Sequence, residues 1–378
     1  MKILVAVYEQ DHPTVEPVWA IHKLAVGFAS AIRPPQSAML VSPQRGPLKG
    51  DELPSPNIYL DLDSEANRIR KAIAPAIPWK TEGARDRTAF LSGLSDVIEQ
   101  TKPDVVEVHN RWRHLPYISK MHPTVPTIIY AHSPVSHLAI HPREYVPYVT
   151  HAFFVSDALR RQFLKHAPGL SGKSSVVLNA SSIESRAPKA SPGRYLLFVG
   201  RIVPAKGLHL LLEAMRSVWE TFPNTELLVA GHITSDTEYA SGMLASCRQL
   251  PRVRYIGTPT GTELKHAYKS AYLTIMPSLS FEASGIVAME SMSCSTPVIA
   301  FANGGLRETI EHGVDGLLVN PFTVEEMATA ILKLLQSEST VRGMGQRAHQ
   351  KSKTRFTHDS RSSKIIEHYQ HILGGTNG

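Results

Sequence analysis

Two glutamates eight positions apart, Glu282 and Glu290, are the most informative acidic residues of the sequence. The apolar run before Pro277-Ser278 predicts a strand, and Ser284-Gly285 predicts the junction to a helix that carries Glu290. The first turn of a helix presents unpaired backbone N–H groups and the positive end of the helix dipole, which together bind phosphate. A carboxylate beside that turn accepts hydrogen bonds from hydroxyl groups. The segment therefore predicts a site for a phosphorylated, hydroxyl-rich ligand, and a solvated glutamate pair without a role is the alternative.

Two histidines follow apolar runs in the first half of the chain. His109 ends the predicted strand 105–109 and precedes Asn110, and His132 directly follows the predicted strand 127–131. The carboxyl ends of parallel strands form the edge at which α/β proteins bind ligands. We therefore expect both histidines at a functional edge, and a structural histidine with satisfied hydrogen bonds is the alternative for each.

The elements that position these residues follow one pattern along the chain. Short apolar runs alternate with longer amphipathic stretches, which is typical of parallel sheets covered by helices on both faces. The strands expected in the first half are 2–8, 38–41, 105–109, 127–131, 152–155 and 175–178, and its helices are 18–32, 87–100 and 157–165. The strands expected in the second half are 195–199, 226–230, 252–256, 273–276, 298–300 and 316–319. Its expected helices are 207–220, 262–270, 286–293, 305–312, 323–336 and 362–372.

One segment, 180–194, interrupts this pattern with Ser, Pro and Gly and has no apolar period. We expect an N-terminal domain at 1–179, a linker at 180–194, a C-terminal domain at 195–358 and a last helix within 359–378 that returns to the first domain. The 378 residues agree with two domains of ordinary size. The predicted fold class is α/β, with two Rossmann-like domains facing across a cleft.

The composition narrows the choice of partners. The formal charge of +7 is spread without a Lys/Arg run or an aromatic-basic motif, so we expect no nucleic-acid partner. Two cysteines are too few for a disulfide framework or a zinc site. The N-terminal apolar run is too short for a signal peptide, and no stretch reaches the roughly 18 apolar residues of a membrane span. We expect a cytoplasmic protein, with peripheral contact to the inner membrane as the alternative.

Four segments of the second half carry a family resemblance. They are Glu282-x7-Glu290, Gly200-Arg201 to Lys206-Gly207, Asn303-Gly304-Gly305 to Glu308, and Gly313 to Val319. With these segments, residues 195–321 resemble the family 4 glycosyltransferases, which have the two-domain GT-B fold and retain the anomeric configuration of the transferred sugar. The likeness extends over nearly the whole chain and is weaker before residue 195.

This resemblance implies a role for each residue of the site. Arg201 and Lys206 hold the donor diphosphate, Glu282 contacts the hydroxyls of the donor sugar, Glu290 takes the ribose hydroxyls, and His132 contacts the donor sugar. Two fixed cations and a helix N-terminus stabilise a departing pyrophosphate in place of Mg²⁺. The catalytic candidates are His132, Glu282, Arg201 and Lys206. The donor-binding candidates are Arg201, Lys206, Ile256, Gly257, Glu282, Ser284, Gly285, Ile286 and Glu290.

The acceptor side departs from the family pattern. Many relatives carry two glycines after the first strand, but this chain has His12-Pro13-Thr14-Val15-Glu16. Without them the loop cannot take glycine-only dihedral angles, so we expect a different acceptor pocket. The acceptor-side candidates are Glu16, His109, Asn110 and Arg111. The basic residues that could face an anionic acceptor or a membrane are Lys80, Arg85, Arg87, Arg111 and Arg113, with ordinary surface charge as the alternative.

The implied reaction is metal-free transfer from a nucleotide sugar, such as UDP-GlcNAc or UDP-Glc, to a glycan or glycolipid acceptor. Asp61-Leu62-Asp63 could suggest a metal, but no third ligand is evident and the GT-B fold needs none. The likeness to lipopolysaccharide-core and exopolysaccharide transferases points to a lipopolysaccharide core or another cell-surface polysaccharide. The alternatives are a GDP-mannose-dependent mannosyltransferase of exopolysaccharide assembly, a nucleotide-sugar epimerase and a non-catalytic subunit that binds a sugar nucleotide.

Overall fold

The computed structural model describes residues 1–7, 20–44, 57–61, 84–138, 140–185, 189, 193, 195–233 and 237–374. Their contacts divide the chain into two compact units. The first unit comprises Met1–Val155, Leu159–Val177 and His358–Gly378, and the second comprises Ser156–Ala158 and Leu178–Thr357. The C-terminal segment is thus part of the first unit.

The first unit contains a parallel sheet. Its strands are β1 (Lys2–Ala6), β2 (Ser37–Gln44), β3 (Asn57–Asp61), β4 (Val105–His109), β5 (Thr127–Ala131), β6 (His151–Phe154) and β7 (Ser174–Val176). Among the described residues they pair in the order β3-β2-β1-β4-β5-β6-β7. All residues of β4 and β5 are buried, as expected for central strands covered on both faces. The order reverses between β1 and β4, and such a switch point forms a ligand-binding crevice at the carboxyl ends of the strands.

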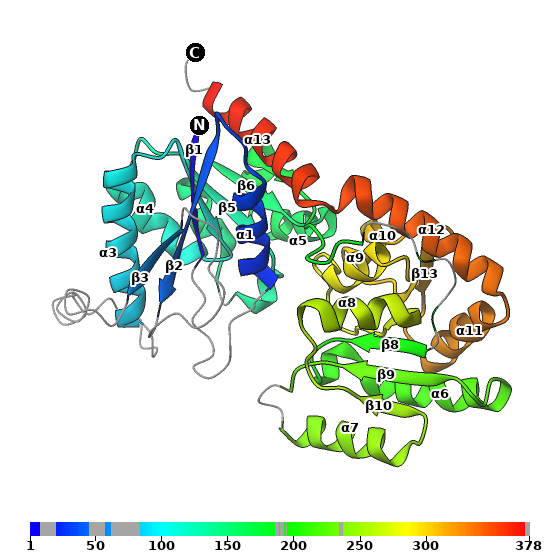
Figure 1. Cartoon of the computed structure of the whole chain (residues 1–378). Helices are drawn as coiled ribbons and strands as arrows, with labels where there is room; N and C mark the ends of the chain where they lie inside the picture. The colour runs from blue at the N-terminus through cyan, green and yellow to red at the C-terminus, as the bar shows by residue number, and fades with distance from the viewer. Residues whose placement is uncertain are drawn as a thin grey trace. The chain divides into compact units, whose positions relative to one another are not determined.

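Helices of the first unit cover this sheet. They are α1 (Ala20–Ala31), α3 (Ala84–Thr101), α4 (Leu115–Met121), α5 (Asp157–His166) and α13 (His358–Gly374). Short 3-10 helices lie at η1 (Trp112–His114), η2 (Val135–His137), η3 (Pro142–Tyr148) and η4 (Pro168–Lys173). Helix α13 packs against α1, so the last described helix of the chain lies on the unit that contains the first strand (Figure 1).

The second unit is a doubly wound sheet of the same kind. Its strands are β8 (Tyr195–Val199), β9 (Glu226–Ala230), β10 (Val253–Tyr255), β11 (Ala271–Met276), β12 (Val298–Phe301) and β13 (Gly316–Val319). They pair in parallel in the order β10-β9-β8-β11-β12-β13. Its helices are η5 (Pro204–Lys206), α6 (Leu208–Thr221), α7 (Thr237–Gln249), α8 (Gly261–Ser270), α9 (Ile286–Ser293), α10 (Leu306–Thr309), α11 (Val324–Leu335) and α12 (Glu338–Arg355).

Strand β8 shows how both faces of this sheet are filled. Leu196 and Phe198 join the apolar cluster that includes the buried residues of α6 and α11, whereas Leu197 joins a cluster with Tyr268 of α8. Alternate side chains of a strand point to opposite faces, so a continuous apolar run supplies two cores. The sheet thereby fixes the loops that follow β8 and β11.

Several predicted elements differ from the structure. The helix expected at 305–312 ends at Thr309, because Ile310 takes an extended conformation and the Glu311 N–H donates to the Asp315 carboxylate at 2.8 Å. The strand expected at 175–178 is β7, at 174–176. Strand β3 and helices α4, α7 and α12 were not predicted from the sequence. The strands at 105–109, 127–131, 195–199, 226–230 and 316–319 and the helix at 286–293 are confirmed with the predicted bounds.

Two expectations from the composition concern the two cysteines and the lack of a membrane-spanning segment. Cys247 and Cys294 are both free and buried. Among the described residues, no helix combines the length and the apolar character that crossing a bilayer requires.

Candidate functional site

The turn that opens α9 is the segment that the sequence predicted to bind phosphate. Gly285 precedes the helix with φ +77°, and a Cβ at this position would lie 2.5 Å from Leu306 Cδ2. Only glycine therefore combines this backbone conformation with this close packing. The first N–H groups of α9 have no acceptor within the helix. Ser284 Oγ is buried and has no hydrogen-bond partner among the described residues, so a further polar atom lies beside these donors.

A second turn holds the loop before α9. The Gly305 N–H donates to the Glu282 carbonyl at 2.7 Å. Gly304 has φ +53°, and a Cβ there would lie 2.3 Å from the same carbonyl oxygen. Asn303 Nδ2 contacts the backbone carbonyls of residues 278, 279 and 280 at 3.3, 3.2 and 2.7 Å. The glycine-rich turn therefore fixes the backbone that carries Glu282.

Lys206 and Glu282 come together in the second unit. The Lys206 ammonium donates to Glu282 Oε1, and both side chains are partly exposed, by 22% and 13%. The loops that carry them are joined, because the N–H groups of Leu279 and Ser280 both donate to the Ala205 carbonyl, at 2.9 and 3.3 Å. The structure thus brings together a cation and a carboxylate that the sequence analysis assigned to diphosphate and sugar.

Three other donor-binding candidates, Arg201, Ile256 and Gly257, lie at the same edge of the sheet. Arg201 follows β8, its side chain is exposed, and no ion pair or hydrogen bond joins it to another described residue. Ile256 and Gly257 follow β10, and the Gly257 carbonyl accepts from the Gly231 N–H at 2.7 Å. The Ile256 side chain is exposed. These positions agree with the predicted edge, and the structure records no contact that joins them to Glu282.

Glu290 has a different environment from Glu282. It lies in the second turn of α9 and is 7% exposed. Its Oε1 accepts from the Ser182 hydroxyl at 2.5 Å, and its Oε2 accepts from the Tyr268 hydroxyl at 3.0 Å. Burial, followed by the charge of Glu290, raises the pKa of Tyr268 well above its usual value. The sequence analysis missed Ser182 and Tyr268, which hold the Glu290 carboxylate in place.

The histidines at the edge of the first unit form a polar cluster. His109 Nδ1 lies 2.9 Å from His132 Nε2, and the two rings are stacked. Asn110 has φ +55°; its Oδ1 accepts from the His132 N–H at 2.7 Å, and its Nδ2 donates to Ser133 Oγ at 2.9 Å. The carboxyl ends of β4 and β5 are therefore joined directly by the side chains of His109, Asn110 and His132.

The cluster also includes the carboxylate of Glu107, which was not a candidate site residue in the sequence. His109 Nε2 lies 2.6 Å from Glu107 Oε1, and the Tyr369 hydroxyl donates to Glu107 Oε2. Burial alone would raise the pKa of Glu107, but the hydrogen bond with His109, together with neighbouring positive charge that includes Arg361, outweighs it, and the pKa is lowered. The signal in the sequence was a single charge within the apolar strand 105–108.

Arg361 of α13 lies in the same buried region. Its guanidinium carbon is 4.7 Å from the centroid of the Tyr130 ring, and its Nε donates to the Tyr130 hydroxyl at 3.3 Å. Burial is the main cause that lowers the pKa of His132 well below its usual value. His132 is therefore neutral at pH 7, and its Nδ1 is buried without a partner among the described residues.

The remaining candidates are only partly placed. Glu16 and Lys80 lie outside the described residues, as do Asp63 and the side chains of Asp61, Arg85 and Arg87. Arg111 and Arg113 are half-buried around η1, where Arg111 precedes the helix without capping it. In the part of the chain that the structure describes, no three His, Cys, Asp or Glu residues are grouped as metal ligands.

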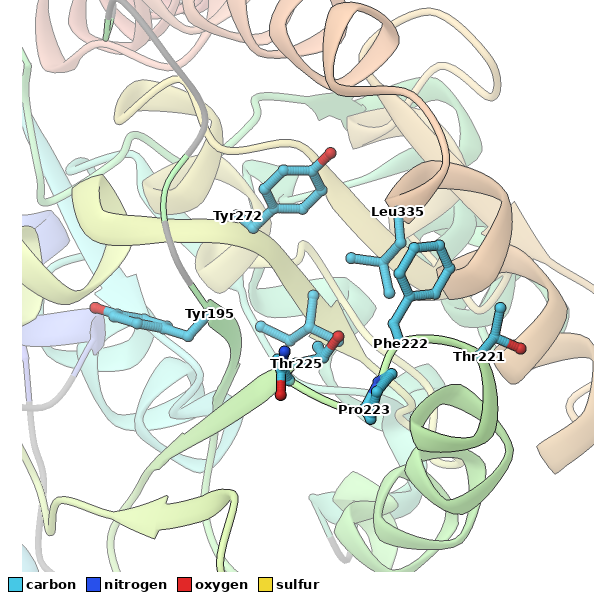
Figure 2. A pocket seen from close by; sticks show the side chains of 9 residues that line it. Tyr195, Thr221, Phe222, Pro223, Thr225, Tyr272 and Leu335 are labelled. Carbon is cyan, nitrogen blue, oxygen red and sulfur yellow. The ribbon is translucent and has the colours of Figure 1, made fainter.

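Figure 2 shows a cavity of the second unit, whose lining includes none of the predicted site residues. Its volume is about 310 Å³. It is formed at the amino-terminal ends of β8 and β11 and by the turn before β9. Its lining comprises Tyr195, Leu196, Thr221, Phe222, Pro223, Asn224, Thr225, Tyr272 and Leu335. Because ligands of parallel α/β sheets bind at the carboxyl ends of the strands, this cavity is at the opposite edge from the predicted donor site.

A comparison with protein families finds a match within the second unit. Residues 181–351 match the family described as glycosyl transferases group 1. A D-inositol 3-phosphate glycosyltransferase of Segniliparus rotundus is 33% identical over 181 residues, which are 47% of this chain and 40% of that protein. An uncharacterised glycosyltransferase of Methanocaldococcus jannaschii is 35% identical over 143 residues, 38% of this chain and 36% of that protein. The chain thus spans about two fifths of the length of these curated relatives.

Solved structures match both units at low sequence identity. The Anabaena protein HepE in complex with UDP and glucose aligns with a TM-score of 0.73 at 16% identity, over 98% of this chain and 100% of that chain. Sucrose-phosphate synthase from Thermosynechococcus elongatus aligns with a TM-score of 0.72 at 18% identity, over 98% of this chain and 99% of that chain. These similarities and the two parallel sheets confirm the predicted α/β fold of the GT-B type.

Proposed function

We propose that the chain is a glycosyltransferase that moves a sugar from a nucleoside diphosphate sugar to a hydroxyl group of an acceptor. The observation that carries this proposal is the pair Lys206–Glu282 beside the first turn of α9, within the residues that match glycosyl transferases group 1. A cation and free N–H groups suit a diphosphate, and a carboxylate suits sugar hydroxyls. Arg201, exposed at the same edge, is proposed as the second cation on the diphosphate.

The proposed donor is a UDP-sugar. The motif likeness described above favours UDP, and the Anabaena HepE structure that shares this fold holds UDP and glucose. Glu290 is buried and held by Ser182 and Tyr268, and its carboxylate is proposed to accept from the ribose hydroxyls. Ile256 and Gly257, at the carboxyl end of β10, are proposed to face the base.

The proposed acceptor is a lipopolysaccharide core or another cell-surface glycan, as the likeness of the motifs implies. A glycolipid acceptor would bring a cytoplasmic enzyme to the inner face of the membrane. A phosphorylated cyclitol is a second candidate, because the Segniliparus rotundus relative is a D-inositol 3-phosphate glycosyltransferase.

The proposed reaction retains the anomeric configuration and needs no metal. The bond between the anomeric carbon and the diphosphate oxygen breaks, and the acceptor oxygen bonds to that carbon on the same face. The acceptor proton passes to an oxygen of the departing diphosphate. Lys206, Arg201 and the α9 N–H groups stabilise the negative charge that develops there. His132, neutral at pH 7, accepts a hydrogen bond from a sugar hydroxyl.

A thermal-shift panel of UDP, GDP, ADP and dTDP, followed by a transfer assay, tests this function. A ligand that binds only the folded protein stabilises it by about 2.7 kcal/mol at a hundredfold excess over its Kd, so we expect UDP to raise the Tm most. Proton NMR of the product should then show the donor's anomeric configuration. Conversion of the donor without an acceptor would indicate an epimerase, and UDP binding without any transfer would indicate a non-catalytic subunit. If none of the four nucleotides raised the Tm, the proposal would be wrong.

A further inference from the structure

A line of buried contacts links helix α13 to the edge of the first unit. The Tyr369 hydroxyl contacts one oxygen of Glu107, and His109 Nε2 lies 2.6 Å from the other. His109 Nδ1 then lies 2.9 Å from His132 Nε2. Glu107, His109 and Tyr369 are all at most 2% exposed, so water does not compete for these hydrogen bonds.

The direction of each hydrogen bond follows from the charge of Glu107. An ionised carboxylate accepts and cannot donate, so both Tyr369 and His109 donate to it. The proton of His109 is therefore on Nε2. The ring nitrogen of His109 that carries the proton is therefore determined by its contact with Glu107.

The charge balance of the buried region decides the state of His109 Nδ1. Arg361 is 2% exposed, and its positive charge already balances the negative charge of Glu107. A positive charge on His109 as well would leave the cluster of Glu107, His109 and Arg361 with a net positive charge, and burying an uncompensated charge is strongly unfavourable. The remaining groups that face the cluster, Tyr130 and Tyr369, are neutral because burial raises the pKa of each phenol. An uncharged His109 that donates through Nε2 to Glu107 keeps a lone pair on Nδ1.

A neutral His109 leaves one arrangement for His132. Since His109 Nδ1 accepts, His132 Nε2 carries the proton and donates, and His132 Nδ1 carries a lone pair. That Nδ1 has no hydrogen-bond partner among the described residues. It is therefore an acceptor without a donor at the functional edge of the sheet.

We propose that Glu107 and His109 are positioning residues that hold His132 in the Nε2–H tautomer, so that His132 Nδ1 accepts a hydrogen bond from a substrate hydroxyl. The inference rests on the proposed function, since a sugar provides the hydroxyl donor. A buried carboxylate fixes the tautomer of an imidazole in the same way in Ser-His-Asp triads. Helix α13 takes part through Tyr369, which holds the second oxygen of Glu107.

Nitrogen-15 NMR of histidine-labelled protein tests the tautomer without substrate. The His132 signals are assigned by their loss in His132→Gln. We expect a protonated Nε2 and an unprotonated Nδ1 in the wild type at pH 7.5, and a mixture of tautomers in Glu107→Gln. A protonated Nδ1 in the wild type would overturn the inference. This measurement does not depend on transferase activity, so it stands even if the proposed function fails.

A double-mutant cycle tests the role in the reaction. We expect Glu107→Gln to lower kcat about 10-fold to 100-fold with little change in the donor KM, as loss of an orienting partner commonly does. His132→Ala should lower kcat at least as much, and the double variant should be no slower than His132→Ala, because Glu107 acts through His132. Additive losses would show that Glu107 has a separate structural role and would refute the positioning role.

Two further variants separate positioning from folding. Tyr369→Phe removes one hydrogen bond to Glu107 and should give a smaller loss of kcat in the same direction. Ser95→Ala is the matched control, because Ser95 Oγ contacts the buried His122 Nε2 at 2.8 Å in the same unit. It should lower the Tm and leave kcat and the His132 signals unchanged. A loss of kcat in Ser95→Ala equal to that in Glu107→Gln would count against a specific role for Glu107.

Discussion

Lys206 and Glu282 form an ion pair between two loops that follow different strands of the second unit. The pair neutralises the edge of the sheet next to the α9 turn. A diphosphate bound at that turn would compete with Glu282 for the ammonium group, and the freed carboxylate would then accept from sugar hydroxyls. Under the proposed function, binding of the donor would therefore separate Lys206 from Glu282.

Lys206→Ala should lower kcat about 10²-fold to 10³-fold, because it removes one donor to the departing diphosphate. Stopped assays of sugar transfer at saturating donor measure this loss. The free energy of unfolding should fall by less than about 1 kcal/mol, since a partly exposed ion pair contributes little to stability. Lys333→Ala, on the exposed side of α11, is the control and should have no effect on kcat. A Lys206→Ala enzyme with normal kcat would remove this residue from the site.

Gly304→Ala should damage both stability and activity. The new Cβ would lie 2.3 Å from the Glu282 carbonyl at φ +53°, so we expect a loss of about 2–4 kcal/mol in the free energy of unfolding and a lower kcat. Gly313→Ala is the matched control, because Gly313 has φ +79° and no atom near the new Cβ. It should cost about 1–2 kcal/mol, from backbone strain alone, and leave kcat unchanged. Urea unfolding and transfer assays distinguish the two variants, and equal effects would contradict the role of the Gly304 turn.

Glu290→Gln should weaken nucleotide binding more than it affects folding. Glutamine keeps partners for Ser182 and Tyr268 but loses the charge that strengthens hydrogen bonds from ribose hydroxyls. The loss of about 1 kcal/mol corresponds to a Kd for UDP that is about five times higher by calorimetry. Glu325→Gln, an exposed position on α11, should leave the Kd unchanged. An unchanged Kd in Glu290→Gln would exclude a contact with the ribose.

The first unit should lose stability in mild acid. Burial is the main cause that lowers the pKa of His132, His151 and His358 from the model-compound value of 6.5, to about 4 for His151 and His358. Below pH 6.5 the unfolded chain therefore binds more protons than the folded chain, and the free energy of unfolding decreases down to about pH 4. The lowered pKa of Glu107 acts in the same direction, because its contribution is present above pH 4.5 and disappears as the pH falls through its folded value.

Calorimetric scans between pH 8 and 4.5 measure this effect. The Tm should be nearly constant above pH 7 and fall below 6.5, and His151→Gln should reduce the fall. His232→Gln, at an exposed histidine, should not. A constant Tm down to pH 4.5 would contradict the buried neutral histidines.

Chelation should leave the reaction unchanged. If Lys206, Arg201 and the α9 N–H groups stabilise the diphosphate, then EDTA should not lower the initial rate of transfer, and added Mg²⁺ should not raise it by more than about twofold. A rate that falls to background in EDTA and returns with Mg²⁺ or Mn²⁺ would replace this mechanism with a metal-dependent one.

The second unit was largely predictable from the sequence because its signals are local. Gly285 marks a helix start within a few residues of Glu282 and Glu290, and strand 195–199 is a continuous apolar run. Helix α12 was missed because most of its residues are polar and its few buried apolar side chains, such as Val341, Met344 and Ala348, give a weak period. The pairing of Lys206 with Glu282 was not predictable in detail, since it depends on the joining of two loops.

The contacts around Glu107 in the first unit could not be predicted from the sequence. His109 and His132 were selected because each ends a strand, and the structure confirms their positions at one edge. Glu107 interrupts an apolar strand and could have been noticed as a buried charge. Its partner Tyr369 is 262 residues away and Arg361 lies on the same distant helix, so no pattern along the chain links them to Glu107.

The position of α13 also bears on how the protein is made. A ribosome releases residues 1–177 long before Tyr369 and Arg361 are synthesised, because the whole second unit is translated between them. During that interval the nascent first unit contains the Glu107 carboxylate without the phenol and the guanidinium that surround it in the finished protein. Domains generally fold in order from the N-terminus during synthesis. In this protein, the first unit can complete its contacts around Glu107 only after the second unit has been synthesised.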